Sequence, residues 1–137
     1  MVVTNMFIFT PGSVRFEEDV YLYSMGSNAT IRCIVANNTI WQHIIFQRQS
    51  ITSNESTVLY DVRNASGTLT VDTQFNDDGY SVSHASESNN FIVTLAIDAV
   101  SCSDEGEYGC ATEVNDFNVL KHDSTSVRLI GQWLNYK

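Results

Sequence analysis

The chain has 137 residues, of which 43% are hydrophobic and 17% charged, and its formal net charge is −9 at pH 7. This length suits one globular domain with a sizeable core. The negative charge disfavours a nucleic-acid partner, because phosphates would be repelled. No apolar run approaches the ~18 residues of a membrane-spanning helix, so we expect no membrane insertion by this chain.

The two ends of the chain are expected to lie outside the domain. Residues 6–9 are apolar, but Pro11 and Gly12 break this stretch, which also lacks the basic segment and cleavage site of a signal peptide. We expect residues 1–10 to be an N-terminal extension or an extra edge strand, residues 11–131 the domain, and residues 132–137 a tail or a linker to a following domain. The sequence is thus interpreted as a fragment of a longer protein.

Short segments with alternating apolar and polar residues, separated by turn residues, predict an all-β domain. In residues 29–35, for example, Ala29, Ile31, Cys33 and Val35 would share the inward face. The Asn-Asp-Asp-Gly run at 76–79 marks a turn. The predicted strands, in chain order, are 14–23, 29–35, 40–47, 58–62, 68–71, 80–84, 91–98, 107–113 and 124–130.

The segment 95–110 is the most informative part of the sequence. It combines the end of a strand, a polar corner and a tyrosine two residues before a cysteine, at Leu95, Ile97, Val100, Asp104, Gly106, Tyr108 and Cys110. These residues resemble the E strand, E–F turn and F strand of the immunoglobulin superfamily. In that family the tyrosine ring packs inside and its hydroxyl bonds back to the turn, an arrangement called a tyrosine corner.

The resemblance implies an immunoglobulin-like, two-sheet antiparallel β-sandwich with a disulfide between Cys33 and Cys110. The 77 positions between these cysteines leave room for two further strands, which implies a variable-type (V-set-like) domain with about nine strands. Trp41 would pack beside the disulfide, although it follows Cys33 by only eight positions, fewer than family members usually show. Cys33 could pair with Cys102 instead, but Cys110 fits the inter-sheet position better.

The sequence departs from the variable-type pattern in two places, and these departures distinguish it from rearranging antigen receptors. Family members often pair the turn aspartate with an arginine at the start of strand D, but no arginine lies between Thr73 and Asn90. Asp104 therefore needs backbone partners or another base, for which Arg63 is a candidate. The last strand also lacks the Phe-Gly-x-Gly bulge of rearranging antigen receptors. The chain looks more like a domain of another cell-surface or secreted recognition protein.

Cysteines and glycosylation signals indicate the secretory route. The odd cysteine, Cys102, is either a small half-buried thiol or a partner in a disulfide to a neighbouring domain or a second copy of the chain. Four Asn-x-Ser/Thr sequons fall where turns or loops are expected, as glycan attachment requires: Asn28, Asn37, Asn54 and Asn64. We therefore expect an extracellular protein that carries N-linked glycans.

No residue pattern indicates catalysis, a metal or a cofactor. His43, His84 and His122 fall on different predicted strands without metal-ligand spacing, and His43 is interpreted as a half-buried structural residue. The acidic stretch 72–78 lacks the regular spacing of a calcium loop. Nucleophile and phosphate-loop motifs are also missing from the sequence. We expect no enzyme activity and no cofactor.

Alternation counted from an inward Trp41 turns Ile44 and Phe46 toward solvent on a central strand. Exposed apolar side chains there indicate either a protein-binding face or a register error of one residue, which would turn them inward. The predicted partner face comprises Ile44, Phe46, Tyr60, Glu113, Phe117 and Arg128.

An immunoglobulin sandwich presents loops and sheet faces rather than reactive groups. We therefore interpret the chain as an extracellular recognition or adhesion module that binds another protein, or a second copy of itself as a homodimer. The expected surface is the one that the family calls the G-F-C-C′ face, together with the F–G loop around Phe117. The alternatives are a module of a secreted innate-immune pattern-recognition protein, a viral immune decoy and a structural spacer domain.

Overall fold

The computed structural model describes residues 13–36, 39, 41–50, 55–65, 68–72, 80–114 and 119–130. These residues form ten strands and one short 3-10 helix, η2 (Cys102–Asp104). The strands are β1 (Val14–Phe16), β2 (Val20–Tyr23), β3 (Ala29–Val35), β4 (His43–Ser50), β5 (Ser56–Ala65), β6 (Thr68–Asp72), β7 (Tyr80–Glu87), β8 (Asn90–Ile97), β9 (Gly106–Val114) and β10 (Val119–Leu129). The predicted all-β fold is confirmed, and β5 and β10 are longer than the sequence indicated.

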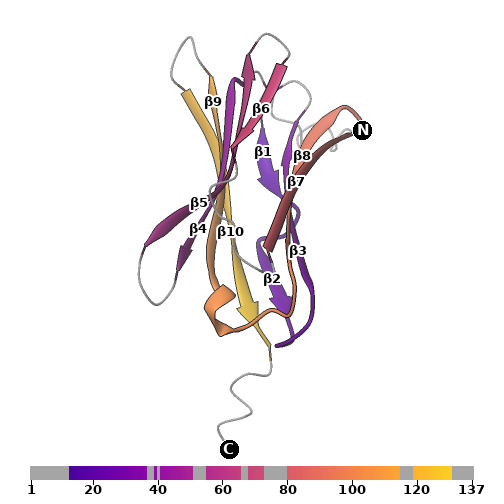
Figure 1. The fold of residues 1–137 in the computed structure, drawn as a ribbon, viewed down its shortest axis with the longest axis vertical. Coiled ribbons are helices and arrows are strands. Elements are labelled where there is room, and N and C mark those ends of the chain that lie inside the picture. Colours follow the sequence, from indigo (N-terminus) through magenta and orange to yellow (C-terminus); the bar gives the residue numbers. More distant parts are fainter. Residues whose placement is uncertain are drawn as a thin grey trace, which may run out of the picture.

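The strands form two sheets that face each other (Figure 1). One sheet has the order β1-β3-β8-β7, and the other has the order β2-β10-β9-β4-β5-β6. Neighbouring strands are antiparallel except for β2 and β10, which are parallel. Each sheet buries one face against the other, so the alternation of apolar residues sets the core.

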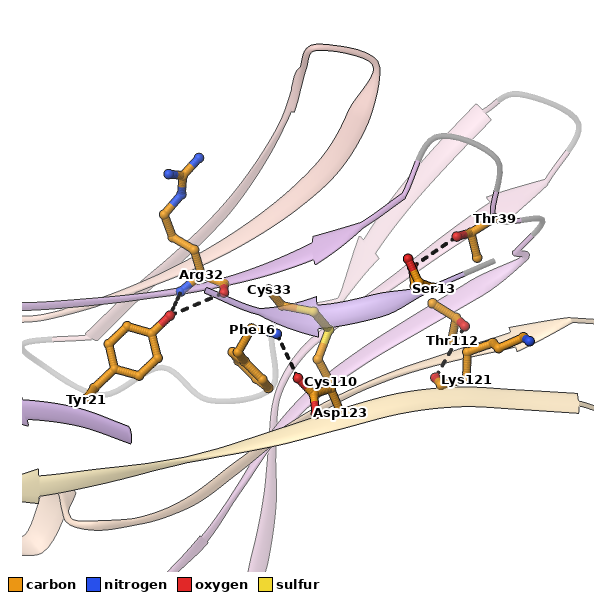
Figure 2. The surroundings of a disulfide bond; sticks show 10 residues. All are labelled: Ser13, Phe16, Tyr21, Arg32, Cys33, Thr39, Cys110, Thr112, Lys121 and Asp123. Carbon is orange, nitrogen blue, oxygen red and sulfur yellow. Dashed lines mark hydrogen bonds between the residues drawn. A yellow bond between two sulfur atoms is a disulfide. The ribbon is translucent and has the colours of Figure 1, made fainter. Parts of the chain in front are cut away.

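The predicted strand 14–23 is divided between the two sheets. β1 pairs with β3 in the four-stranded sheet, whereas β2 pairs with β10 in the six-stranded sheet. Side chains hold both pieces in place: the backbone N–H of Phe16 donates to Asp123 on β10 at 2.9 Å, and the Tyr21 hydroxyl lies 3.4 Å from the backbone nitrogen of Arg32 (Figure 2). The polar residues 17–19 make the crossing between the sheets.

The disulfide joins the two sheets through the centre of the core. Cys33 on β3 and Cys110 on β9 are bonded, with Cα atoms 6.4 Å apart, and both are essentially unexposed. The inward positions predicted for β3 are confirmed, since Ala29, Ile31 and Val35 are also buried. Because the bond closes a loop of 77 positions, it would stabilise the fold by about 4–5 kcal/mol in the chain-entropy model.

The predicted orientation of β4 is wrong by one residue. Ile44 and Phe46 are fully buried, with exposed fractions of 0%, so the alternative of a shifted register is confirmed. Trp41 precedes β4 and is half-buried against Phe91, with ring centroids 5.0 Å apart. Because the chain leaves the extended conformation at Gln42, alternation counted from Trp41 does not continue into the strand.

Phe46, rather than Trp41, occupies the core position opposite the disulfide. It lies in register with Cys110 on the neighbouring strand and packs edge-on against Phe16, with ring centroids 5.6 Å apart. Phe46 follows Cys33 by thirteen residues, which removes the short spacing that Trp41 required. The buried aromatic residue that β4 places beside Cys110 is therefore a phenylalanine.

Tyr60 also lies in the core instead of on the partner face. A bulge in β5 opposite Phe46 and Gln47 leaves both Leu59 and Tyr60 buried. The hydroxyl of Tyr60 lies 2.5 Å from Nδ1 of His84 on the opposing sheet. A bulge places two consecutive residues against one partner, so it breaks the alternation on which the prediction rested.

Candidate functional site

The tyrosine corner forms as the sequence predicted. The hydroxyl of Tyr108 donates to the backbone carbonyl of Asp104 at 2.7 Å, and burial raises the pKa of this tyrosine. Leu95, Ile97 and Val100 are buried next to it. Within η2, the Asp104 carboxylate accepts from the backbone N–H of Ser101 at 2.8 Å. The corner thus ties the turn after β8 to the start of β9.

Asp104 finds its base on β4, a residue that the sequence reasoning missed. Tyr80 donates to the Asp104 carboxylate, and Arg48 donates to the Tyr80 hydroxyl at 2.5 Å while lying 3.9 Å from the carboxylate. Burial raises the pKa of Tyr80, and the bond to Asp104 raises it further. Arg63, the candidate from sequence, lies elsewhere and is largely exposed. Arg48 follows Phe46 by two residues on β4, so both side chains point to the inner face of the sheet. A correctly assigned register would therefore have identified Arg48 as a candidate partner of Asp104.

The outer face is the surface of the six-stranded sheet that points away from the four-stranded sheet. The predicted outward orientation of Glu113 and Arg128 agrees with their intermediate exposure, since Thr112, Val127 and Leu129 beside them are buried. The described members of the outer face on the four central strands include His43, Ile45, Gln47, Asp61, Arg63, Glu107, Gly109, Ala111, Glu113, His122, Ser124, Ser126 and Arg128.

Strand register places charged residues in one row across this face. His43 on β4 is paired with Glu113 on β9 and with Arg63 on β5. Its Nε2 contacts the carboxylate of Asp61, and its Nδ1 lies 3.7 Å from the carboxylate of Glu113. The side chains of His43 and Asp61 are only 11% and 12% exposed, so His43 is half-buried as predicted, but on the outer side of the sheet.

A depression of about 250 Å³ lies beside this row. Ile45 and Ala111 supply its apolar part, and the full lining is His43, Ile45, Gln47, Ala111, Thr112 and Glu113. A second hollow of about 130 Å³ shares Gln47 and is also lined by Gly109 on β9 and Ser124 on β10. Concave apolar surface with a few polar groups at its rim is suited to holding a partner's side chain.

The remaining predicted site residues are dispersed. Asn28 is exposed before β3, and its Oδ1 accepts from the backbone N–H of Ala99 at 3.2 Å. Asn64 lies within β5 and not in a loop, so its predicted placement is wrong. Cys102 is exposed in η2, which overturns the half-buried alternative. Asn37, Asn54 and Phe117 lie outside the described residues, as do the segments 1–10 and 132–137.

The described part of the chain contains neither a candidate metal cluster nor a candidate membrane-spanning helix. Within it, no group of three or more histidine, cysteine or acidic side chains is arranged to hold a metal ion. None of its helices has the length and hydropathy needed to span a membrane. The arrangement on the outer face suits binding, through an apolar hollow and hydrogen-bonding side chains around it.

Comparison with solved structures identifies the fold. The chain is similar to the first immunoglobulin domain of RIG-5, solved as the RIG-5 IG1 homodimer, with a TM-score of 0.62 and 13% sequence identity. The match covers 88% of this chain and 98% of that one. No protein-family model and no curated protein matches the sequence. The chain therefore has an immunoglobulin-like sandwich fold.

Proposed function

We propose that this chain is an extracellular recognition module that binds another protein through the outer face of its six-stranded sheet. The observation that carries the proposal is the depression between β4 and β9, where Ile45 and Ala111 lie among polar side chains. An apolar hollow in a broad sheet face provides the buried centre that protein interfaces need, and the polar residues around it provide the rim. The β9–β10 loop with Phe117 would extend this surface.

Several features support an extracellular, variable-type module. The Cys33–Cys110 disulfide and the four sequons are typical of proteins that pass through an oxidising compartment. β5 and β6 add two strands beyond β4, as variable-type domains do. A glycan at Asn28 would attach through the amide nitrogen and leave its Oδ1 bonded to Ala99. The RIG-5 domain, crystallised as a homodimer, has the same fold.

The test is a binding array with paired variants. The glycosylated chain, made multivalent, is offered to purified extracellular domains that include the chain itself. We expect Ile45→Glu to abolish the binding that the unmodified chain shows, because it places a charge in the hollow. Ile34→Glu is the matched control, since Ile34 is half-buried on β3 in the other sheet. Binding that survives Ile45→Glu, or that both variants lose equally, contradicts a role for the outer face.

A further inference from the structure

We propose that the partner of the outer face is a second copy of this chain, docked about a two-fold axis that runs along β4, with Glu113 of each copy meeting Arg63 of the other. This inference rests on the proposed function and adds the identity of the partner and the residues that select it. It follows from the distribution of charge across three neighbouring strands.

In the row through His43, the residues on the two sides of β4 carry opposite charges. Glu113 on β9 and Arg63 on β5 flank His43 on its two sides, one strand away in each direction. Neighbouring strands lie about 4.8 Å apart, so the two charges flank β4 about 10 Å from each other. Both side chains are accessible: 46% of Glu113 and 63% of Arg63 is exposed.

The existing contacts leave these two side chains available. The Glu113 carboxylate is 3.7 Å from Nδ1 of His43, beyond normal hydrogen-bond distance. Arg63 is 3.9 Å from Asp61, whose carboxylate is already in close contact with His43. An incoming carboxylate or guanidinium group could therefore bond to them without breaking a short contact of the fold.

A two-fold axis in the plane of the face determines which residues meet. If the axis runs along β4, the two sides of the strand exchange, so Glu113 faces Arg63 of the second copy and Arg63 faces its Glu113. Ile45 then lies opposite its own counterpart, and the β9 side of each hollow faces β5 of the other copy. An axis across the strands through the same row would bring Glu113 against Glu113, which is repulsive. The charge pattern thus selects the axis along β4.

Net charge on the outer face is also compatible with self-association. The whole chain carries −9. In contrast, the described side chains of the outer face on β4, β5, β9 and β10 include three carboxylates, Asp61, Glu107 and Glu113, and two guanidinium groups, Arg63 and Arg128. Most of the negative charge therefore lies elsewhere, and two outer faces can approach each other with little net repulsion.

Charge exchange tests this arrangement directly. The glycosylated chain is studied by sedimentation equilibrium in a Cys102→Ser background, which removes any dimer linked through that exposed thiol. We expect a reversible dimer that Glu113→Arg and Arg63→Glu each weaken by about tenfold or more, because each change creates two like-charge contacts. An equimolar mixture of the two variants should dimerise as well as the parent, since the mixed pair has opposite charges at both contacts. The variant with both changes should also recover the dimer.

The outcomes separate this inference from the proposed function. Recovery in the mixture supports the two-fold arrangement and shows that both variants are folded. A dimer that neither change weakens, or that the mixture fails to restore, overturns it. A chain that stays monomeric at all concentrations also overturns it. In that case, loss of heterologous binding by Ile45→Glu in the array would still support the outer face as a recognition surface.

Discussion

Strand β4 carries two charged clusters on its opposite faces, and they differ in burial. Inside the sandwich, Arg48 and Tyr80 bond to Asp104, whose side chain is 8% exposed. On the outer face, Glu113 and Arg63 stand on either side of His43 with 46% and 63% of their side chains exposed. Similar residue types thus have different roles, because a buried charge needs its partner for the fold while an exposed one remains available for binding.

The largest loss of stability is expected for a change in the core, at Phe46 beside the inner cluster. Phe46→Ala should lower the free energy of unfolding by about 3–5 kcal/mol, because it leaves a cavity opposite the disulfide. Trp41→Ala should cost no more than about 2 kcal/mol, since this ring is only half-buried. Chemical denaturation of both variants provides the comparison. A larger loss for Trp41→Ala would return Trp41 to the central position that the sequence suggested.

The second-largest loss of stability is expected in the inner charged cluster of Arg48, Tyr80 and Asp104. Asp104→Ala removes the acceptor for Tyr80 and leaves Arg48 in a mostly buried position without its carboxylate, so we expect a loss of about 3 kcal/mol. Glu113→Ala, the matched change on the outer face, should alter stability by less than about 0.5 kcal/mol. Urea unfolding curves for the two variants measure the difference. Equal effects would mean that burial does not distinguish the clusters.

Alkaline pH should lower the stability of the fold through its buried tyrosines, Tyr80 of the inner cluster among them. The pKa values of Tyr80 and Tyr108 are raised by burial, and that of Tyr80 also by its bond to Asp104. Above about pH 10 the unfolded chain releases these protons while the folded chain retains them. This stabilising contribution is present below pH 10 and is lost as the pH rises further, by up to about 1.4 kcal/mol per pH unit for each tyrosine.

Denaturation between pH 8 and about pH 11.5 tests this dependence. Tyr80→Phe should give a shallower decline than the parent, because one of the titrating groups is gone. The variant will be less stable at neutral pH, so the slope rather than the absolute value is compared. An unchanged slope would exclude Tyr80 as a source of the alkaline loss.

The smallest effect on stability is expected on the outer face. Ile45→Glu replaces a half-buried side chain on the outer surface of the sheet, so the free energy of unfolding should fall by no more than about 1 kcal/mol. Thermal unfolding together with the binding array separates the two properties. A loss of several kcal/mol would show that Ile45 serves the core, and its effect on binding would then carry no information about an interface.

Local patterns in the sequence were sufficient for the fold class and for the corner. The resemblance of Asp104, Tyr108 and Cys110 to the immunoglobulin pattern implied a tyrosine corner, and the structure has it with a hydroxyl-to-carbonyl distance of 2.7 Å. The alternation in β3 correctly predicted its inward residues. These features depend on neighbours within one strand or one turn, so the sequence contains the information directly.

The candidate site could be predicted only in part. On β9 and β10 the outward orientation of Glu113 and Arg128 followed from uninterrupted alternation. On β4 the break at Gln42 reset the alternation, and on β5 a bulge placed Tyr60 in the core. Both irregularities invert side chains relative to the expected pattern, and each depends on how the strand pairs with its neighbours in the sheet.

The sequence by itself determined an all-β sandwich, its cross-sheet disulfide partners through family resemblance, and the corner before β9. Only the tertiary structure decided that Phe46 fills the core, that Arg48 reaches Asp104, and that Glu113, His43 and Arg63 share one row. The physical reason is that strand register is a property of pairs of strands. A shift of one residue exchanges the buried and exposed faces without changing the local composition.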